Sequence, residues 1–348
     1  MSVGASGGLR IAVVGATGAV GTIMLDVLEE RRLPVAEVVP FASARSAGRE
    51  LRGMEVRALE EGAIEGFDLA LFSAGAGVSR EWAPRFAAAG AVVVDNSSAW
   101  RTDPGIPLVV AEVNPEALDA HCGIVANPNC STMQLLVAIK PIHDAVGIER
   151  LLVSTYQSVS GTGVKAVEEL KAQTHAVLHD MAPAPPEVYP HPIAFNVLGG
   201  AGTFAEGEDH TNEERKMIFE TRKILADETI RVGVTCARVP VISSHSESVN
   251  VETREPLSAE DCRALLARAP GVAVVDDPTR DSYPTALDAA GRDEVLVGRI
   301  RRDPSHERAL QLWVVSDNLR KGAATNAVQL AELLHSRGLL GARAARAA

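Results

Sequence analysis

The first third of the chain alternates short apolar runs with helical patterns, and this rhythm restricts the fold more than any other feature. Each run is apolar at consecutive positions, so both faces of the strand must be buried, as in a parallel sheet between helices. The runs are residues 11–14, 35–42, 69–72 and 91–94, with helical patterns at 19–30 and 79–89. We therefore predict a doubly wound α/β domain over residues 1–130.

The rest of the chain has a different pattern. After Cys130 a helical pattern at 133–142 leads into long segments in which apolar and polar residues alternate, as in strands with one buried face. These segments are residues 151–160, 241–253, 295–301 and 309–316. They predict an α+β domain over residues 131–320 with a large mixed or antiparallel sheet, one face on helices and the other free to meet a partner.

Three shorter segments complete this outline. Prolines recur between residues 182 and 192, where missing amide donors exclude regular structure, so we expect a long surface loop. An amphipathic helix within residues 321–337 should complete the first domain. Residues 338–348 should form a frayed tail.

The composition limits the classes of function. With 348 residues, 46% hydrophobic and 23% charged, the chain fits a globular protein of two domains. A formal net charge of −11 argues against a broad basic surface for nucleic acid. No stretch approaches the roughly 20 apolar residues of a membrane span, and the first ten residues contain no apolar signal core, so we expect a cytoplasmic protein.

Four cysteines lie far apart without a Cys-x-x-Cys pair, which predicts neither a metal site nor a disulfide framework. Cys236 and Cys262 occur in apolar patterns and should pack in the core. Cys130 differs, because it follows an Asn-Pro-Asn turn at the start of a predicted helix. A helix N-terminus stabilises a thiolate and lowers a thiol pKa from its usual value of about 8.5. We interpret Cys130 as a nucleophile, against the alternative of a buried structural cysteine.

A glycine-rich turn joins the first predicted strand to the first helix. Backbone amides at such a helix N-terminus attract an anion, and the missing side chains admit a dinucleotide pyrophosphate, as in Rossmann-type domains. The candidate contacts are Gly15, Thr17, Gly18, Ala19, Val20 and Gly21. The spacing is G-x-x-G-x-x-G rather than the commoner G-x-G-x-x-G, so a plain strand-to-helix turn is the alternative.

The residues after the second strand indicate which dinucleotide is bound. An acidic residue there would bind the ribose hydroxyls of NAD, whereas this sequence has Ser43, Arg45 and Ser46. A cation and two hydroxyls suit the 2′-phosphate of NADP, so we predict NADP. The alternative is that Arg45 is a solvated loop residue.

Several motifs together resemble the aspartate-semialdehyde dehydrogenase family. The Asn-Pro-Asn-Cys-Ser-Thr segment, the glycine-rich start and Asp-Asn-Ser-Ser-Ala-Trp-Arg at 95–101 are similar to that family, and further motifs occur in its order. They lie at residues 156–163, 194–197, 213–216, 238–241 and 322–326. The resemblance spans residues 11 to about 334, and departs from the family's pattern at 198–203, which leaves the loop at 181–211 in doubt.

The resemblance implies a reaction and its catalytic residues. The reaction is the reversible NADPH-dependent reductive dephosphorylation of L-4-aspartyl phosphate to L-aspartate 4-semialdehyde, on the route to lysine, threonine and methionine. Cys130 would attack the acyl phosphate and form a thioester. His245 matches the family's acid/base histidine, and Gln157 would orient the acyl group.

The same resemblance implies the binding residues and a homodimer, leaving open whether dimers pair into tetramers. Arg238 would bind the substrate α-carboxylate and Glu214 its α-ammonium, while Arg101 and Lys216 would bind phosphate. Further implied contacts are Asn129 for substrate, and Ser73, Asn96, Ser160, Gly161 and Asn326 for cofactor. Glu214 and Lys216 could instead belong to the solvated start of a surface helix, and Gly161 could be a turn glycine.

Two other functions compete with this one. N-acetyl-γ-glutamyl-phosphate reductase shares the general plan, but its substrate has a blocked amine and needs no anionic partner for an ammonium group. A redox-sensing protein that binds NADP without turnover would not need Cys130, Gln157, His245 and Arg238 together.

Overall fold

The computed structural model describes residues 8–341. They form two compact units: residues up to Pro128 together with those from Ala323 onward, and Asn129–Gly322. Each unit contains a six-stranded sheet. None of the helices within the described residues is long and apolar enough to cross a membrane.

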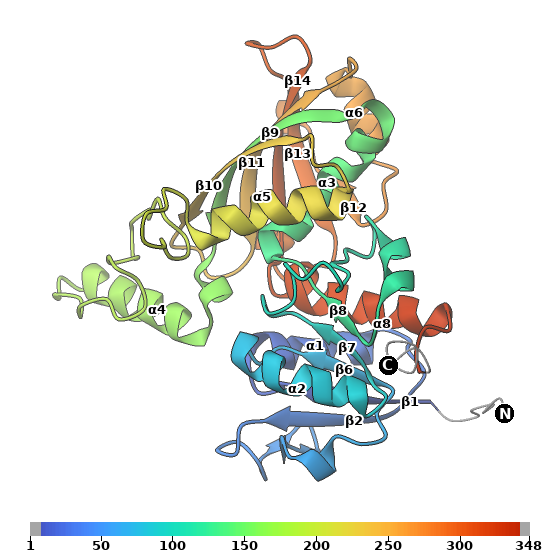
Figure 1. Cartoon of the computed structure of the whole chain (residues 1–348). Helices are drawn as coiled ribbons and strands as arrows, with labels where there is room; N and C mark the ends of the chain where they lie inside the picture. The colour runs from blue at the N-terminus through green and yellow to red at the C-terminus, as the bar shows by residue number, and fades with distance from the viewer. Residues whose placement is uncertain (1–7, 342–348) are drawn as a thin grey trace. The chain divides into compact units, whose positions relative to one another are not determined.

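The sheet of the first unit is entirely parallel, in the order β5-β2-β1-β6-β7-β8 (Figure 1). Its strands are β1 (Leu9–Val14), β2 (Val35–Ala42), β5 (Arg57–Ala58), β6 (Leu69–Phe72), β7 (Val92–Asp95) and β8 (Ile124–Ala126). A short hairpin of β3 (Glu50–Leu51) and β4 (Met54–Glu55) follows β2. The buried consecutive runs of β1, β6 and β7 explain why helices must cover both faces.

Helices cover the two faces of this sheet in different ways. Ile11 and Leu71 belong to a core shared with α1 (Ala19–Glu30) and α8 (Asn326–Ser336). Alternate residues such as Ala12 and Phe72 pack on the other side with α2 (Ala76–Ala88). This arrangement confirms the doubly wound α/β class.

The C-terminal segment departs from the prediction in two places. Residues Arg320–Thr325 form a π-helix before α8 rather than part of one regular helix. Leu339 is buried in the core of the first unit, so residues 338–341 are not the expected frayed tail. The rest of the predicted tail, residues 342–348, lies outside the described residues.

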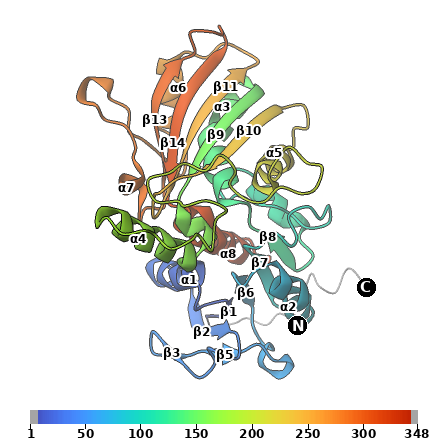
Figure 2. The same cartoon turned by 90° about the vertical axis from the view of Figure 1, so that its left-hand side faces the viewer.

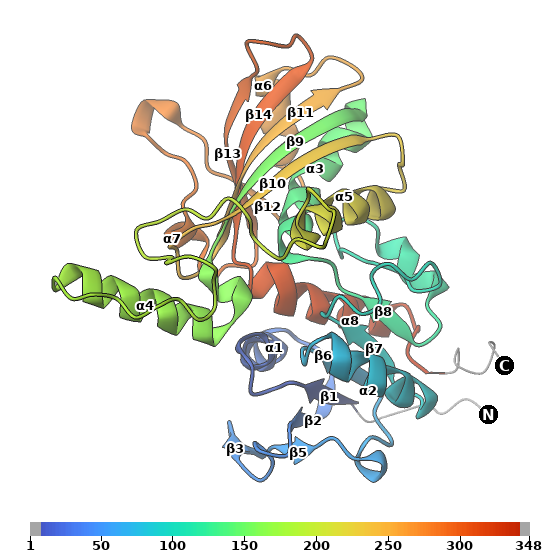
Figure 3. The same cartoon turned by 60° about the vertical axis from the view of Figure 1, so that its left-hand side comes forward.

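The sheet of the second unit is mixed, in the order β10-β9-β11-β14-β13-β12 (Figure 3). Its strands are β9 (Ile148–Gln157), β10 (Arg231–Arg238), β11 (His245–Thr253), β12 (Val272–Val274), β13 (Val295–Arg302) and β14 (Ala309–Ser316). The helices α3 (Cys130–Val146), α5 (Asn212–Leu225) and α6 (Ala259–Leu266) pack on it, which confirms the predicted large mixed sheet. A short helix, α7 (Ala286–Ala289), precedes β13.

In this sheet two predicted strands had wrong ends, and two strands, β10 and β12, were missed. β9 stops at Gln157 and the chain continues as a 3-10 turn (Val159–Thr162). β11 starts only at His245, because Ser244 has a φ of 72°, which a strand does not allow. Cys236, which lies in the unpredicted strand β10, is buried in the core as expected. Cys262 is also buried, as predicted.

The proline-rich segment after α4 (Val164–Leu178) contains no regular structure, as predicted. α4 extends away from the sheet of the second unit (Figure 2). Ala166 and Leu170 of α4 pack against Ile193 and Leu198 of the following loop. The loop therefore completes the packing of this helix.

Candidate active site

Register in the second sheet brings polar side chains from four neighbouring strands into one row. Arg238 pairs with Gln157, and His245 pairs with Ser316. Tyr156 pairs with Ser246 on the antiparallel strands β9 and β11, so the next residues, Gln157 and His245, lie opposite each other. All four side chains are buried on the sheet face that packs against α3 and α5. Residues separated by more than 70 positions in sequence thus become neighbours.

Cys130 is the first residue of α3, and Asn129 is its N-cap. The Asn129 side chain accepts hydrogen bonds from the amides of Ser131 (2.9 Å) and Thr132 (3.3 Å). This cap fixes the first turn and leaves the half-buried thiol at the positive end of the helix. A thiolate is stabilised at such a position, as a nucleophile requires.

Glu213 of α5 connects this turn to the row on the sheet. It accepts hydrogen bonds from Asn129 Nδ2 (2.7 Å) and Gln157 Nε2 (3.4 Å), and pairs with Lys216 Nζ at 3.0 Å. Gln157 Nε2 also donates to Ser131 Oγ at 3.0 Å. Burial alone would raise the pKa of Glu213, but Lys216 and the Asn129 hydrogen bond outweigh it and hold the pKa below its usual value. Glu213 is therefore a buried carboxylate beside the nucleophile.

Glu214, the predicted partner of the substrate ammonium, is buried but engaged elsewhere. One carboxylate oxygen accepts the Thr211 amide (2.8 Å) in a capping box at the start of α5, and the other accepts the Cys236 amide (3.0 Å). Both oxygens thus hold backbone in place. Glu213, one residue earlier, is the glutamate that contacts Gln157. A solvated helix start does not describe Glu214, because Glu214 is buried.

His245 and Arg238 meet around Ser158. The imidazole Nδ1 accepts the Ser158 amide at 3.0 Å, and Arg238 Nη1 donates to the Ser158 carbonyl oxygen at 2.7 Å. A Cβ on Gly161 would lie 3.2 Å from His245 Nε2 and 3.4 Å from Arg238 Nη1. The missing side chain of Gly161 therefore leaves space at the edge of the imidazole. Burial, and after it the charge of Arg238, lowers the pKa of His245 to about 3.

The glycine-rich turn of the first unit fits a bound pyrophosphate. Gly15 has a φ of 87°, and a Cβ there would lie 2.6 Å from the Ser73 carbonyl oxygen. A Cβ on Gly21 would overlap the Gly15 carbonyl oxygen. α1 begins after Gly18 without a side-chain cap or an acidic residue in its first turn. Its first amides thus have no competing side chain, and an anion can approach them.

The other predicted cofactor residues of the first unit differ in accessibility. Ser43 and Arg45 are exposed and Ser46 is half-buried, in a turn directly after β2. Asn326 is fully buried, and its amide group bonds to Ala111, Val109 and Asn127. The Asn326 side chain thus braces this unit, and its packing does not support the predicted cofactor contact.

Two more predicted residues lie beside the end of β7. The Asn96 side chain donates to the Phe72 carbonyl oxygen (3.1 Å), and Arg101 Nη2 donates to the Asn96 carbonyl oxygen (2.8 Å). Arg101 is buried. No cluster of metal-ligating side chains occurs among residues 8–341.

Sequence reasoning missed four residues of this region. They are Ser131, Ser158, Glu213 and Asn318, all buried and hydrogen-bonded to predicted site residues or to one another. The i,i+3 spacing of Glu213 and Lys216 was a usable signal, because such pairs share one helix face. The other three had no local signal, because their partners lie far away in sequence.

Comparisons with known proteins match most of the chain. Residues 10–121 match the family model "Semialdehyde dehydrogenase, NAD binding domain" and residues 139–321 match "Semialdehyde dehydrogenase, dimerisation domain". The aspartate-semialdehyde dehydrogenase of Aquifex aeolicus is 55% identical over 96% of this chain and 100% of its own length.

Solved structures agree with the family models. Aspartate semialdehyde dehydrogenase II from Vibrio cholerae, solved in complex with ASA, has a TM-score of 0.90 at 48% identity, covering 95% of this chain and 99% of its own. The Candida albicans enzyme, solved with NADP, has a TM-score of 0.74 at 25% identity, covering 95% of this chain and 99% of its own.

Proposed function

The chain belongs to the aspartate-semialdehyde dehydrogenase family of oxidoreductases, and from this premise we propose the reaction and the part that each residue plays in it. The reaction is the reversible, NADPH-dependent reductive dephosphorylation of L-4-aspartyl phosphate to L-aspartate 4-semialdehyde. It serves the biosynthesis of lysine, threonine and methionine. The observation that carries this proposal is the first turn of α3, which holds Cys130 and is hydrogen-bonded to Glu213 and to Gln157. Gln157 belongs to the buried row that also contains Arg238 and His245.

Covalent catalysis begins at Cys130. The thiolate attacks the acyl carbon, the carbon–oxygen bond to phosphate breaks, and a thioester remains on the enzyme. When bound, NADPH supplies the hydride that reduces this thioester. The aldehyde then leaves as the carbon–sulfur bond breaks and the thiolate returns. Gln157, which donates to Ser131 Oγ, is close enough to the first turn of α3 to orient the acyl group.

The aspartyl group carries an α-carboxylate and an α-ammonium, so its recognition needs one cationic and one anionic side chain. Arg238 can bind the α-carboxylate through its planar fork, because its Nε is buried and has no hydrogen-bond partner in the described structure. Glu213 replaces Glu214 as the partner of the α-ammonium, since it stays ionised in a buried position. Lys216 and Arg101 remain proposed phosphate-binding residues.

The cofactor is NADP. The turn from Gly15 to Gly21 would hold its pyrophosphate at the start of α1, and the match to an NAD binding domain supports this use. Arg45, with Ser43 and Ser46, would bind the 2′-phosphate, because these residues are accessible in the turn after β2. The NADP in the Candida albicans relative supports the same choice.

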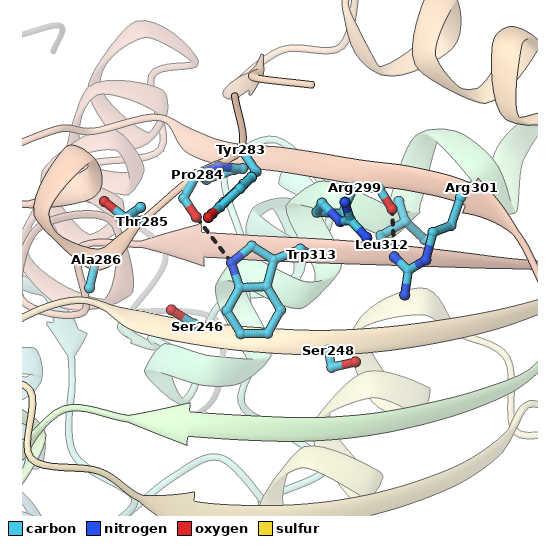
Figure 4. A pocket seen from close by; sticks show the side chains of 10 residues that line it. All are labelled: Ser246, Ser248, Tyr283, Pro284, Thr285, Ala286, Arg299, Arg301, Leu312 and Trp313. Carbon is cyan, nitrogen blue, oxygen red and sulfur yellow. Dashed lines mark hydrogen bonds between the residues drawn. The ribbon is translucent and has the colours of Figure 1, made fainter. Parts of the chain in front are cut away.

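The outer face of the second sheet is the proposed homodimer surface. Leu152 and Tyr156 are exposed on this face, and the Tyr156 ring packs on Trp313 with centroids 5.4 Å apart. A hollow of about 510 Å³ lies beside Trp313, between Tyr283 and Arg301 (Figure 4). Exposed aromatic and aliphatic side chains on one sheet face are typical of a protein interface. The match of residues 139–321 to a dimerisation domain supports this use.

The test is phosphate-dependent NADPH formation from aspartate semialdehyde. We expect wild-type turnover that stops without phosphate, and a loss of at least about a thousandfold in Cys130→Ala. Cys122→Ala, which removes an exposed cysteine, is the matched control and should keep wild-type activity. Turnover of the N-acetyl-γ-glutamyl substrate instead would refute the substrate assignment, and NADP binding without any turnover would favour a sensor.

A further inference from the structure

The first turn of α3 leaves the backbone amide of its N-cap without an acceptor in the same helix. The N-cap is Asn129, whose side chain accepts the amides of Ser131 and Thr132. In a capping box, the third helical residue is a glutamate or glutamine that reaches back and accepts the N-cap amide. In α3 that residue is Thr132, whose hydroxyl has no hydrogen-bond partner within the described part of the chain. The Asn129 amide therefore needs an acceptor from another element.

That acceptor is Glu220 of α5, the helix that packs beside α3 (Figure 3). Glu220 Oε2 accepts the Asn129 amide at 2.7 Å, and both residues are buried. α5 has a capping box of its own, in which Glu214 accepts the amide of the N-cap Thr211 at 2.8 Å. Glu220 does for α3 what Glu214 does for α5, but from a neighbouring helix. A hydrogen bond to a carboxylate is roughly twice as strong as one between neutral groups.

α5 holds Asn129 at two points. Glu213 and Glu220 are about two helical turns apart, so their side chains leave the same side of α5. Glu213 accepts the side-chain amide of Asn129 at 2.7 Å, and Glu220 accepts the backbone amide at the same distance. The Asn129 carbonyl oxygen accepts the Met133 amide at 2.9 Å. Every polar atom of Asn129 thus makes a hydrogen bond, and the residue before the nucleophile is fixed in orientation.

The two glutamates have different surroundings. Glu213 also contacts Gln157 and Lys216, which places it among the proposed substrate-binding residues. Glu220 is only 1% exposed and bonds to the backbone of the turn that carries Cys130. A side chain in this position acts on the reaction through the turn that it holds, and not by contact with a bound molecule.

We propose that Glu220 is a positioning residue: it supplies the missing capping-box carboxylate of α3 and thereby fixes Cys130 relative to Glu213 and Lys216 of α5. This inference rests on the proposed function, because it takes Cys130 as the nucleophile that forms the thioester. A reacting atom that is about 1 Å out of place can lose about a hundredfold in rate. The hydrogen bond of Glu220 should therefore matter more for kcat than for substrate affinity.

Kinetics of two Glu220 variants test the catalytic part. In Glu220→Ala we expect kcat for phosphate-dependent NADPH formation to fall by about ten- to a hundredfold, while KM for aspartate semialdehyde changes less than about threefold. Glu220→Gln can still accept the Asn129 amide, through a weaker neutral bond, and should keep at least about fivefold more kcat than Glu220→Ala. A loss that is mainly in KM would assign Glu220 to substrate binding, and equal losses in the two variants would exclude the hydrogen bond as the cause. Either result would overturn the proposal.

Asp303→Asn is the matched control, because it changes a carboxylate to an amide at another bond to the backbone of the same unit. Asp303 Oδ1 accepts the Ser305 amide at 2.8 Å. The Asp303 amide donates to Ala309, the first residue of β14, whereas the buried row includes Ser316, its last residue. At about 3.3 Å per residue, Asp303 lies roughly 20 Å from that row. Asp303→Asn should keep wild-type kcat, and a loss as large as in Glu220→Gln would mean that kcat reports general destabilisation instead of positioning.

Hydrogen exchange of the full-length variants tests the structural part without substrate. The measurement is deuterium uptake, by mass spectrometry, of a peptide that covers residues 127–133. We expect faster uptake in Glu220→Ala than in wild type, and wild-type uptake in Asp303→Asn. Unchanged uptake in folded Glu220→Ala would overturn the proposal.

Two features of this design keep the test decisive. If Glu220→Ala does not fold, Glu220→Gln replaces it: faster uptake with a lower kcat supports the proposal, and wild-type values of both overturn it. If the wild-type enzyme does not turn over aspartate semialdehyde, the proposed function fails, and deuterium uptake still decides whether Glu220 holds the turn of Cys130.

Discussion

Gly322 has no room for a side chain, and replacing it should disable the nucleophile without unfolding the protein. A Cβ added there would lie 2.8 Å from Cys130 Cβ and 3.3 Å from Cys130 Cα. Carbon atoms in contact normally lie about 3.5 to 4.0 Å apart, so Gly322→Ala requires a shift of roughly 1 Å. No side-chain rotation can provide it, because both atoms are tied to the backbone of α3.

The size of the effect depends on which part of the structure moves. If Cys130 stays, overpacking should cost about 1 to 3 kcal/mol of stability. If the first turn of α3 moves instead, a misplacement of about 1 Å can cost about a hundredfold in rate. Asn129 holds this turn through Glu220 (2.7 Å) and Glu213, so we expect both effects in part.

Three measurements on Gly322→Ala check this reasoning. They are the melting temperature, kcat/KM for phosphate-dependent NADPH formation, and the rate of Cys130 alkylation. Gly199→Ala is the matched control, because a Cβ there meets no atom within 4 Å. If Gly322→Ala resembles Gly199→Ala in all three, the close approach of Gly322 to the nucleophile has no consequence and the reasoning is wrong.

Three further predictions concern single side chains. Glu213→Gln should lower kcat/KM by about ten- to a hundredfold, mainly through KM, because it removes the charge that binds the ammonium. Glu214→Gln should change the kinetics little and cost about 1 kcal/mol of stability, because it weakens the helix cap. The opposite pattern would identify Glu214 as the ammonium partner. Burial raises the pKa of Glu247 well above its usual value, so the stability linked to this group is lost as pH rises above about 4.5, its value in the unfolded chain. In urea titrations the unfolding free energy of Glu247→Gln should fall less with pH than that of wild type, by up to about 1.4 kcal/mol per pH unit. Parallel curves would mean that Glu247 does not titrate as a buried acid. Arg45→Ala should raise KM for NADPH about tenfold and leave KM for NADH unchanged, and equal effects on both cofactors would refute a 2′-phosphate contact.

The outline of the fold could be predicted from the sequence because local patterns determine it. Consecutive apolar runs identified β2 and β6 to the residue, and alternation identified β14. Element ends depended on backbone geometry instead, as at Ser244, whose positive φ delays β11. β10 was missed because Gly233 interrupts its apolar pattern and its pairing partner β9 lies about 80 residues earlier.

In the candidate site, too, some features follow from local sequence patterns and others depend on tertiary packing. The sequence by itself determined that Cys130 starts a helix, because an Asn-Pro-Asn turn before a helical run is a local signal. It could not decide between Glu213 and Glu214, since adjacent positions on a helix point about 100° apart and only packing against β10 and α3 shows which one faces Gln157. It also could not place Ser158 beside His245, because these two residues lie 87 positions apart in sequence. Local patterns specify elements, whereas side-chain partners depend on which strands pair, and only the tertiary structure decided those.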